Sequence, residues 1–293
     1  MSLDHKTLIK KVKKISLFTS RNIDSFFIGD YKSIFKGDGI EFNDVREYQY
    51  GDNFKDIDWN ITARFNKPYI KRFVEERERI VYFVVDVSSS LNTFIGQKNK
   101  FEIMAEILAI LSYSALAAGD KVSVILFSDG IEKIIKPTKG LRSFYNIILQ
   151  FLVYENKIGL KTNINNVLRL LNNIVRKKSL VFLISDFFDD NYEKNLLKLS
   201  LKNEIIPIIV NNDREFLPID NCIIQFYDIE TERFFRLNLN KKEHKNHLQN
   251  LIEERRKTIQ NLIKRKIFPL VISEEKDIHL QLLEYFRRRK HQK

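Results

Sequence analysis

The most informative part of this sequence is the run Ile80-Val81-Tyr82-Phe83-Val84-Val85 and the residues Asp86-Val87-Ser88-Ser89-Ser90 that follow it. The run is apolar and rich in β-branched and aromatic residues, which is typical of a strand buried on both faces of a sheet. Asp86, Ser88 and Ser90 are therefore expected at the C-terminal end of that strand, the edge at which open α/β sheets bind ligands. A carboxylate and two alternate hydroxyls are the oxygen ligands that a hard divalent cation prefers, so the pattern predicts a metal-binding loop.

A second part of the chain places similar chemistry at the same edge. The apolar run Leu180 to Ile184 is followed by Ser185-Asp186, much as Asp86 follows the first run. Since parallel strands end at the same edge of a sheet, Asp86 and Asp186 are expected to lie close together. Thr162 lies in a loop immediately before an expected helix, where a threonine considered alone most often caps free backbone amides.

Strands and helices alternate along the chain after residue 79. Short apolar runs predict strands at 80–85, 122–127, 131–135, 180–184, 205–210 and 268–272, the second and third forming a hairpin. The longer segments between these runs predict helices at 100–118, 142–154, 164–176, 191–202 and 242–265, with a closing helix after the last strand. This order predicts an α/β fold with a mostly parallel sheet covered by helices on both faces.

The sequence before residue 79 has a different character. An amphipathic helix is expected in the first 20 residues, and residues 34–73 are rich in glycine, aspartate and aromatic residues, which predicts short strands and loops. We therefore divide the chain into an N-terminal helix with a small β-rich subdomain, 1–78, and an α/β domain, 79–293, with an inserted β-ribbon around 213–239.

Composition and charge limit the classes of protein. With 44% hydrophobic residues the chain is expected to fold, and the single cysteine, Cys222, excludes an internal disulfide. No stretch reaches about 18 apolar residues, so we expect a cytoplasmic protein whose contact with a membrane would be peripheral. The net charge of +12 lies near the two ends of the chain, because residues 15–240 hold equal numbers of basic and acidic residues. Basic ends suit nucleic acid, anionic lipid or an acidic protein, but the interpretation that we favour is a solvated helix face.

In this order and on these loops, Asp86, Ser88, Ser90, Thr162 and Asp186 resemble the metal-ion-dependent adhesion site of von Willebrand factor type A domains. The resemblance implies a three-layer, Rossmann-like fold. It also implies that the three hydroxyls bind Mg²⁺, or Mn²⁺, directly and that the two aspartates complete the shell. A glutamate or aspartate of a partner protein would take the open coordination position, because a metal with few charged ligands stays electrophilic.

The upstream segment resembles a bacterial family called domain of unknown function 58. The resemblance rests on Gly37-x-Gly39-x-Glu41-Phe42, Arg46-Glu47-Tyr48, Gly51-Asp52, Ile57-Asp58-Trp59, Ala63-Arg64 and Glu75-Glu76-Arg77. Lys55 departs from the family, which usually has arginine there, and lysine cannot make a planar bidentate contact. The resemblance implies an adaptor that works with a MoxR-type AAA+ ATPase in the assembly or maturation of protein complexes.

Six residues of that segment, here called the upstream signature, have two interpretations. They are Arg46, Asp52, Asp58, Trp59, Arg64 and Glu76. One interpretation is a partner-binding face. The other, which we favour, is a set of internal salt bridges and turn caps, because aspartate and glycine are ordinary residues at turns.

Three functions from different classes are consistent with the sequence. The favoured one is a metal-dependent interaction module that binds an acidic residue of a partner through its metal and has no catalytic residue. An alternative is a metal-assisted phosphohydrolase with Asp86 as nucleophile, although such enzymes usually have Asp-x-Asp and position 88 is serine. The third is a binder of nucleic acid or membrane through its basic surface. The adhesion-type site is expected outside the core, so that alanine at Asp86 or Ser88 would leave the fold intact.

Overall fold

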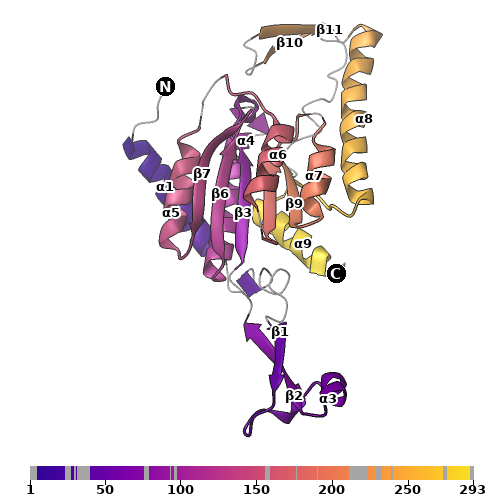
Figure 1. The fold of residues 1–293 in the computed structure, drawn as a ribbon. Coiled ribbons are helices and arrows are strands. Elements are labelled where there is room, and N and C mark those ends of the chain that lie inside the picture. Colours follow the sequence, from indigo (N-terminus) through magenta and orange to yellow (C-terminus); the bar gives the residue numbers. More distant parts are fainter. Residues whose placement is uncertain are drawn as a thin grey trace.

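The architecture is a six-stranded sheet between two layers of helices (Figure 1). The computed structural model describes residues 5–23, 28–29, 31, 40–75, 79–92, 94–95, 98–155, 159–175, 177–189, 191–210, 223–228, 233–238, 240–272 and 276–290. The sheet consists of β3 (Ile80–Asp86), β6 (Lys121–Phe127), β7 (Ile131–Thr138), β8 (Leu180–Ser185), β9 (Glu204–Val210) and β12 (Leu270–Ile272). Its order is β12-β9-β8-β3-β6-β7, in which β7 alone runs antiparallel to its neighbour. The predicted three-layer α/β fold with a mostly parallel sheet is confirmed.

Helices cover both faces of the sheet. One face packs against α4 (Lys100–Ala117), α5 (Arg142–Leu152) and α9 (Ile278–Lys290), and α1 (His5–Asn22) packs on α4 and α5. The other face packs against α6 (Ile164–Ile174), α7 (Glu193–Ser200) and the last turns of α8 (Lys242–Lys264). The helix α6 buries apolar residues at three- and four-residue spacing, whereas α4 is apolar on nearly every side because the sheet, α1, α5 and α9 surround it.

The central strand β3 is buried on both faces, and its alternate residues meet different helices. Val81, Phe83 and Val85 join the core that includes α4 and α5, whereas Tyr82 and Val84 join the core that includes α6 and α7. An unbroken apolar run is therefore what this position in the sheet requires.

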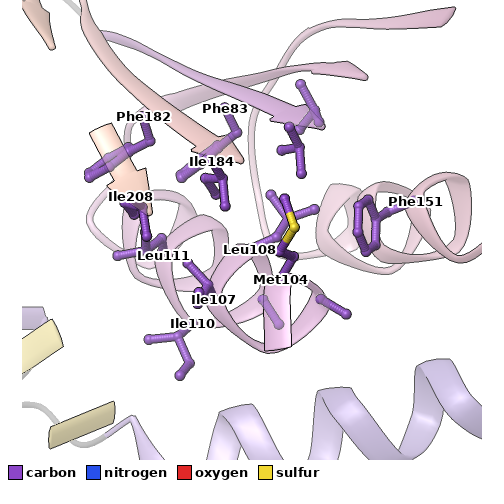
Figure 2. Packing of buried hydrophobic residues seen from close by; sticks show 14 of the residues in the cluster. Phe83, Met104, Ile107, Leu108, Ile110, Leu111, Phe151, Phe182, Ile184 and Ile208 are labelled. Atoms are coloured by element: carbon purple, nitrogen blue, oxygen red, sulfur yellow. The ribbon is translucent and has the colours of Figure 1, made fainter. Parts of the chain in front are cut away.

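The larger core lies between the sheet and α4 (Figure 2). Phe83 and Phe182, on the neighbouring strands β3 and β8, stack with ring centroids 5.1 Å apart. Phe151 of α5 packs on Phe101 of α4, with centroids 4.3 Å apart. Burying each such side chain contributes about 1.5–3 kcal/mol, so this packing fixes the positions at which β3 and β8 end.

A small unit formed by residues 40–75 lies apart from the sheet, beyond the end where β3 begins (Figure 1). Its strands β1 (Ile40–Glu47) and β2 (Tyr69–Glu75) pair antiparallel, with a bulge between Phe42 and Asp44. Between them lie a 3-10 turn, η1 (Phe54–Asp56), and a short helix, α3 (Trp59–Phe65). The prediction of strands and loops here missed α3, which begins at the capping side chain of Asp58.

The remaining elements are peripheral. The strands β10 (Ile223–Asp228) and β11 (Arg233–Asn238) pair antiparallel inside the predicted ribbon, and β4 (Phe94–Ile95) pairs with β5 (Lys98–Asn99). The helix α1 packs on α4 and α5, where Lys11 pairs with Glu155, so it lies on the α/β body and not beside β1 and β2. The division of the chain at residue 78 stays a prediction. Within the described residues, no helix is both long and apolar enough to cross a membrane.

Candidate metal centre

Asp86 is the last residue of β3 and is fully buried. Its Oδ1 accepts a hydrogen bond of 2.8 Å from the backbone N–H of Ser88, which closes the turn after the strand. Its Oδ2 accepts a hydrogen bond of 2.7 Å from the hydroxyl of Ser185, at the end of β8. The expectation that this site lies outside the core is therefore wrong for Asp86, and it is wrong for Ser88 as well, which is 2% exposed. Alanine in place of Asp86 would remove two buried hydrogen bonds and would not be neutral for the fold.

The hydroxyls of Ser88 and Ser90 lie side by side, with 3.0 Å between their Oγ atoms. The intervening side chain, that of Ser89, points elsewhere and binds a different loop, so the alternation predicted from the sequence is present. Two oxygens on adjacent vertices of a Mg²⁺ octahedron, each about 2.1 Å from the metal, lie about 3 Å apart. The separation of the two hydroxyls matches that edge, and in this respect the residues fit a magnesium ion.

The loop that carries Thr162 is docked on the Ser88–Ser90 turn. The backbone N–H of Ser89 donates to the carbonyl of Leu160 at 2.9 Å, and the N–H of Leu160 donates to Ser89 Oγ at 2.8 Å. Thr162 is half-buried two residues further on. The N-cap of α6 is Asn163, whose side chain accepts from Asn166 N, and not Thr162, the residue for which the sequence suggested that role.

Asp189 links the same loop to the end of β8. Its Oδ2 accepts a hydrogen bond of 2.6 Å from the backbone N–H of Ile164, the first residue of α6. A carboxylate at this position satisfies a free helix amide and interacts favourably with the helix dipole. Asp189 thus fixes the loops of Thr162 and Asp186 relative to each other.

Asp186 is fully buried next to a lysine that the sequence interpretation missed. Lys100, the first residue of α4, is 2% exposed, and its Nζ lies 3.6 Å from Asp186 Oδ2. The same ammonium lies 5.5 Å from the centre of the Phe188 ring. A lysine at a helix N-terminus interacts unfavourably with the helix dipole. A lysine at the start of the predicted helix 100–118 was therefore the feature of the sequence from which Lys100 could have been identified.

The electrostatics of the site favour a cation. Burial raises the pKa of Asp86 most, and the neighbouring Asp186 carboxylate raises it further. Hydrogen bonds from Ser185 and Ser88 act in the opposite direction, and the pKa remains at about 7. Two buried carboxylates thus share a region that contains too little positive charge to keep Asp86 readily ionised.

The structure brings together most of the predicted metal ligands. Asp86, Ser88 and Ser90 are joined by the contacts described above, Asp186 is close enough to Asp86 to raise its pKa, and the loop of Thr162 contacts Ser89. If bound here, a divalent cation would supply an electrophilic centre at the sheet edge. Ligation of a metal by these residues stays a prediction.

The described residues of the upstream signature lie elsewhere, in the β1–β2 unit, and two of them, Arg46 and Asp52, bind each other. Arg46 makes two hydrogen bonds to the carboxylate of Asp52, at 2.9 and 2.7 Å, and Asp52 also accepts from Gln49 N. The pKa of Asp52 is lowered, mainly because Arg46 donates a hydrogen bond to the ionised carboxylate. Asp58 caps α3 and lies 3.8 Å from Lys71 Nζ. These contacts agree with the structural interpretation of Arg46, Asp52 and Asp58.

Two further signature residues that the structure describes, Trp59 and Arg64, make none of these contacts. Trp59 is 68% exposed, Arg64 is exposed, and the departing residue Lys55 is exposed as well. Glu76 lies outside the described residues. The signature therefore divides into a polar set that holds the β1–β2 unit together and an exposed set whose role the fold does not explain.

The fold is an α/β domain in which helices cover both faces of a mostly parallel six-stranded sheet. The chain belongs to the family described as "Protein of unknown function DUF58", which matches residues 44–258. It is 22% identical over 216 residues to uncharacterized proteins of Mycobacterium bovis and Mycobacterium tuberculosis, an alignment that covers 73% of this chain and 68% of each relative.

Solved structures that match this chain in part include the conserved hypothetical protein BatB from Bacteroides thetaiotaomicron. It is 11% identical, with a TM-score of 0.47, and the match covers 73% of this chain and 100% of that chain. Another is the SpRpn10 VWA domain, 10% identical with a TM-score of 0.33, matched over 46% of this chain and 77% of its own.

Proposed function

We propose that this protein is a non-catalytic, metal-dependent interaction module. In this proposal Mg²⁺, or Mn²⁺, is held by Ser88, Ser90 and Thr162, with Asp86 and Asp186 completing the shell. A glutamate or aspartate of a partner protein binds the open position of the metal. The observation that carries the proposal is the pair of buried carboxylates beside two hydroxyls 3.0 Å apart, at the edge where the strands end.

The surroundings of Asp86 support a role in the ligand shell. Both carboxylate oxygens accept hydrogen bonds, and the residue is fully buried. The serine at position 88, where phosphohydrolases with an aspartyl nucleophile usually have a second aspartate, favours binding over the phosphohydrolase alternative.

The partner that we propose is a MoxR-type AAA+ ATPase or one of its client proteins. Membership of the DUF58 family and the resemblance described from the sequence support this choice. In such a complex the chain would act as an adaptor, and the metal would make the contact depend on an acidic side chain of the partner.

Two measurements on the purified protein test the proposal. Isothermal titration with Mn²⁺ alone should show binding to the wild type and much weaker binding to Ser90→Ala, which removes one ligand from a half-buried position. Immobilised protein should then retain a purified MoxR-type ATPase in Mg²⁺ and release it in chelator. Ser143→Ala is the matched control, because its hydroxyl bonds the carbonyl of Lys139, away from the metal centre. Equal retention by wild type and Ser90→Ala with and without Mg²⁺ would contradict the proposal.

A further inference from the structure

Lys100 is an unusual residue in this fold because its charge is buried. Its side chain is 3% exposed, although lysine is almost never fully buried unless its charge is paired. Removing an ammonium group from water is costly, and the positive end of the α4 dipole repels a cation further. Helix formation and burial both disfavour a lysine here, so something else in the structure must compensate.

The compensation comes from the metal centre. The ammonium lies 3.6 Å from Asp186 Oδ2, and it lies 5.5 Å from the centre of the Phe188 ring, whose face attracts cations. Asp186 and Phe188 belong to the loop after β8, whereas Lys100 begins α4 on a different part of the chain. The contact therefore joins the proposed metal ligand Asp186 to the first turn of the central helix.

We infer that Lys100 is a positioning residue of the metal centre, whose ammonium neutralises Asp186 in the metal-free protein and opposes binding of the divalent cation. The inference rests on the proposed metal site and adds a residue to it. With a divalent cation bound, three positive charges would face the two carboxylates of Asp86 and Asp186. The excess of positive charge would favour an anionic group from the partner as the next ligand.

This arrangement has a consequence for the metal-free protein. Without Lys100, the contacts described above would leave the two buried carboxylates of Asp86 and Asp186 with no buried cation beside them. Removing one partner of a buried ion pair in this way is strongly destabilising. The lysine thus allows the site to persist without metal, and it weakens metal binding in return.

The test compares Lys100→Met with the wild type, because methionine keeps the length and apolar character of the side chain but removes its charge. Isothermal titration with Mn²⁺ alone should show binding that is about tenfold tighter or more in Lys100→Met, since a repelling charge has been removed. The melting temperature of the metal-free variant should fall by about 5 °C or more, and saturating Mn²⁺ should restore most of the loss. Lys136→Met is the matched control, because Lys136 is exposed on the edge strand β7 and should change neither value.

A second variant keeps the test valid if Lys100→Met does not fold. The double variant Lys100→Met with Asp186→Asn removes both charges and should be more stable without metal than Lys100→Met alone. A double variant that is no more stable, or a Lys100→Met protein that binds Mn²⁺ with unchanged or lower affinity while the wild type binds it, would overturn the inference.

The outcomes separate this inference from the proposed function. Mn²⁺ binding by Lys100→Met but not by the wild type would support the role of Lys100 and would contradict a metal-dependent function of the natural protein. Absence of Mn²⁺ binding by both proteins would overturn both.

Discussion

The hydroxyl of Ser185 donates a hydrogen bond of 2.7 Å to Asp86 Oδ2 and so joins the ends of two neighbouring strands that are 99 residues apart in the sequence. Ser185 Oγ also accepts from the backbone N–H of Phe187, at 3.0 Å. Phe187 has a φ of 56°, a left-handed conformation that is costly for a non-glycine residue. One hydroxyl thus orients the central carboxylate and holds the loop that carries Asp186.

We expect Ser185→Ala to destabilise the protein by about 1–3 kcal/mol, because it leaves a buried carboxylate oxygen and a buried N–H without their partner. Mn²⁺ affinity should fall as well, since Asp86 and Asp186 lose their relative orientation. Chemical denaturation and calorimetric titration measure the two effects. Ser143→Ala, at a surface hydrogen bond, should change neither, and a fully stable Ser185→Ala protein would show that the link between the strands is unimportant.

The stability of the metal-free protein should depend on pH through Asp86. Because its pKa is raised to about 7 in the folded protein, above its ordinary value of 3.8, the folded state binds the proton more tightly than the unfolded state. The stability from this group is complete at low pH and is lost as the pH rises through about 7, with a slope of at most about 1.4 kcal/mol per pH unit. Denaturation in chelator between pH 5 and pH 8 measures it.

Two controls identify Asp86 as the source of that slope. Asp86→Asn carries no titrating proton, so its stability should vary less over the same range. Saturating Mg²⁺ favours the ionised carboxylate and should flatten or reverse the slope for the wild type. A slope that is the same in Asp86→Asn would assign the effect to other groups.

Asp189 should support the metal site without binding the metal. Asp189→Ala removes the 2.6 Å hydrogen bond to Ile164 N, so the loop of Thr162 should loosen and Mn²⁺ affinity should fall. The loss should be smaller than that in Ser90→Ala, because no metal ligand is removed. Hydrogen exchange of the first amides of α6 checks the local effect, and Mn²⁺ binding lost to the same extent in both variants would instead make Asp189 a ligand.

Asp58 should matter to the β1–β2 unit as a helix cap. Its Oδ1 accepts from Asn60 N and Ile61 N, and loss of such a cap costs about 1 kcal/mol. Asp58→Ala should therefore accelerate hydrogen exchange in α3. Asp58→Asn is the matched control, since asparagine also caps helices and loses only the distant pairing with Lys71. If Asp58→Asn accelerated hydrogen exchange in α3 as much as Asp58→Ala does, the negative charge of Asp58, and not its capping role, would be the important property.

The exposed and the internally bonded parts of the upstream signature should respond differently to mutation. Arg46→Ala breaks both hydrogen bonds to Asp52, so amides around Gln49 should exchange faster. Trp59→Ala should leave exchange and melting temperature nearly unchanged, because the indole is 68% exposed. Loss of ATPase retention in Trp59→Ala, with a normal melting curve, would assign Trp59 to a partner-binding face.

Much of the fold followed from local patterns in the sequence. The apolar runs of β3 and β8 and the periodic segment of α6 predicted their elements closely, because burial on two faces or on one helical stripe leaves a readable pattern. The short helix α3 was missed, since seven residues carry too little periodicity and its start depends on a single cap.

The sequence by itself determined which side chains stand at the ends of the strands, because the order of apolar runs and the alternation of Asp86, Ser88 and Ser90 are local properties. Only the tertiary structure decided what surrounds them. The hydrogen bond from Ser185, the cap by Asp189 and the buried ammonium of Lys100 join residues that are far apart in the chain. Burial and the neighbouring charge, which raise the pKa of Asp86, likewise arise only when those segments pack together, since they depend on distances in space.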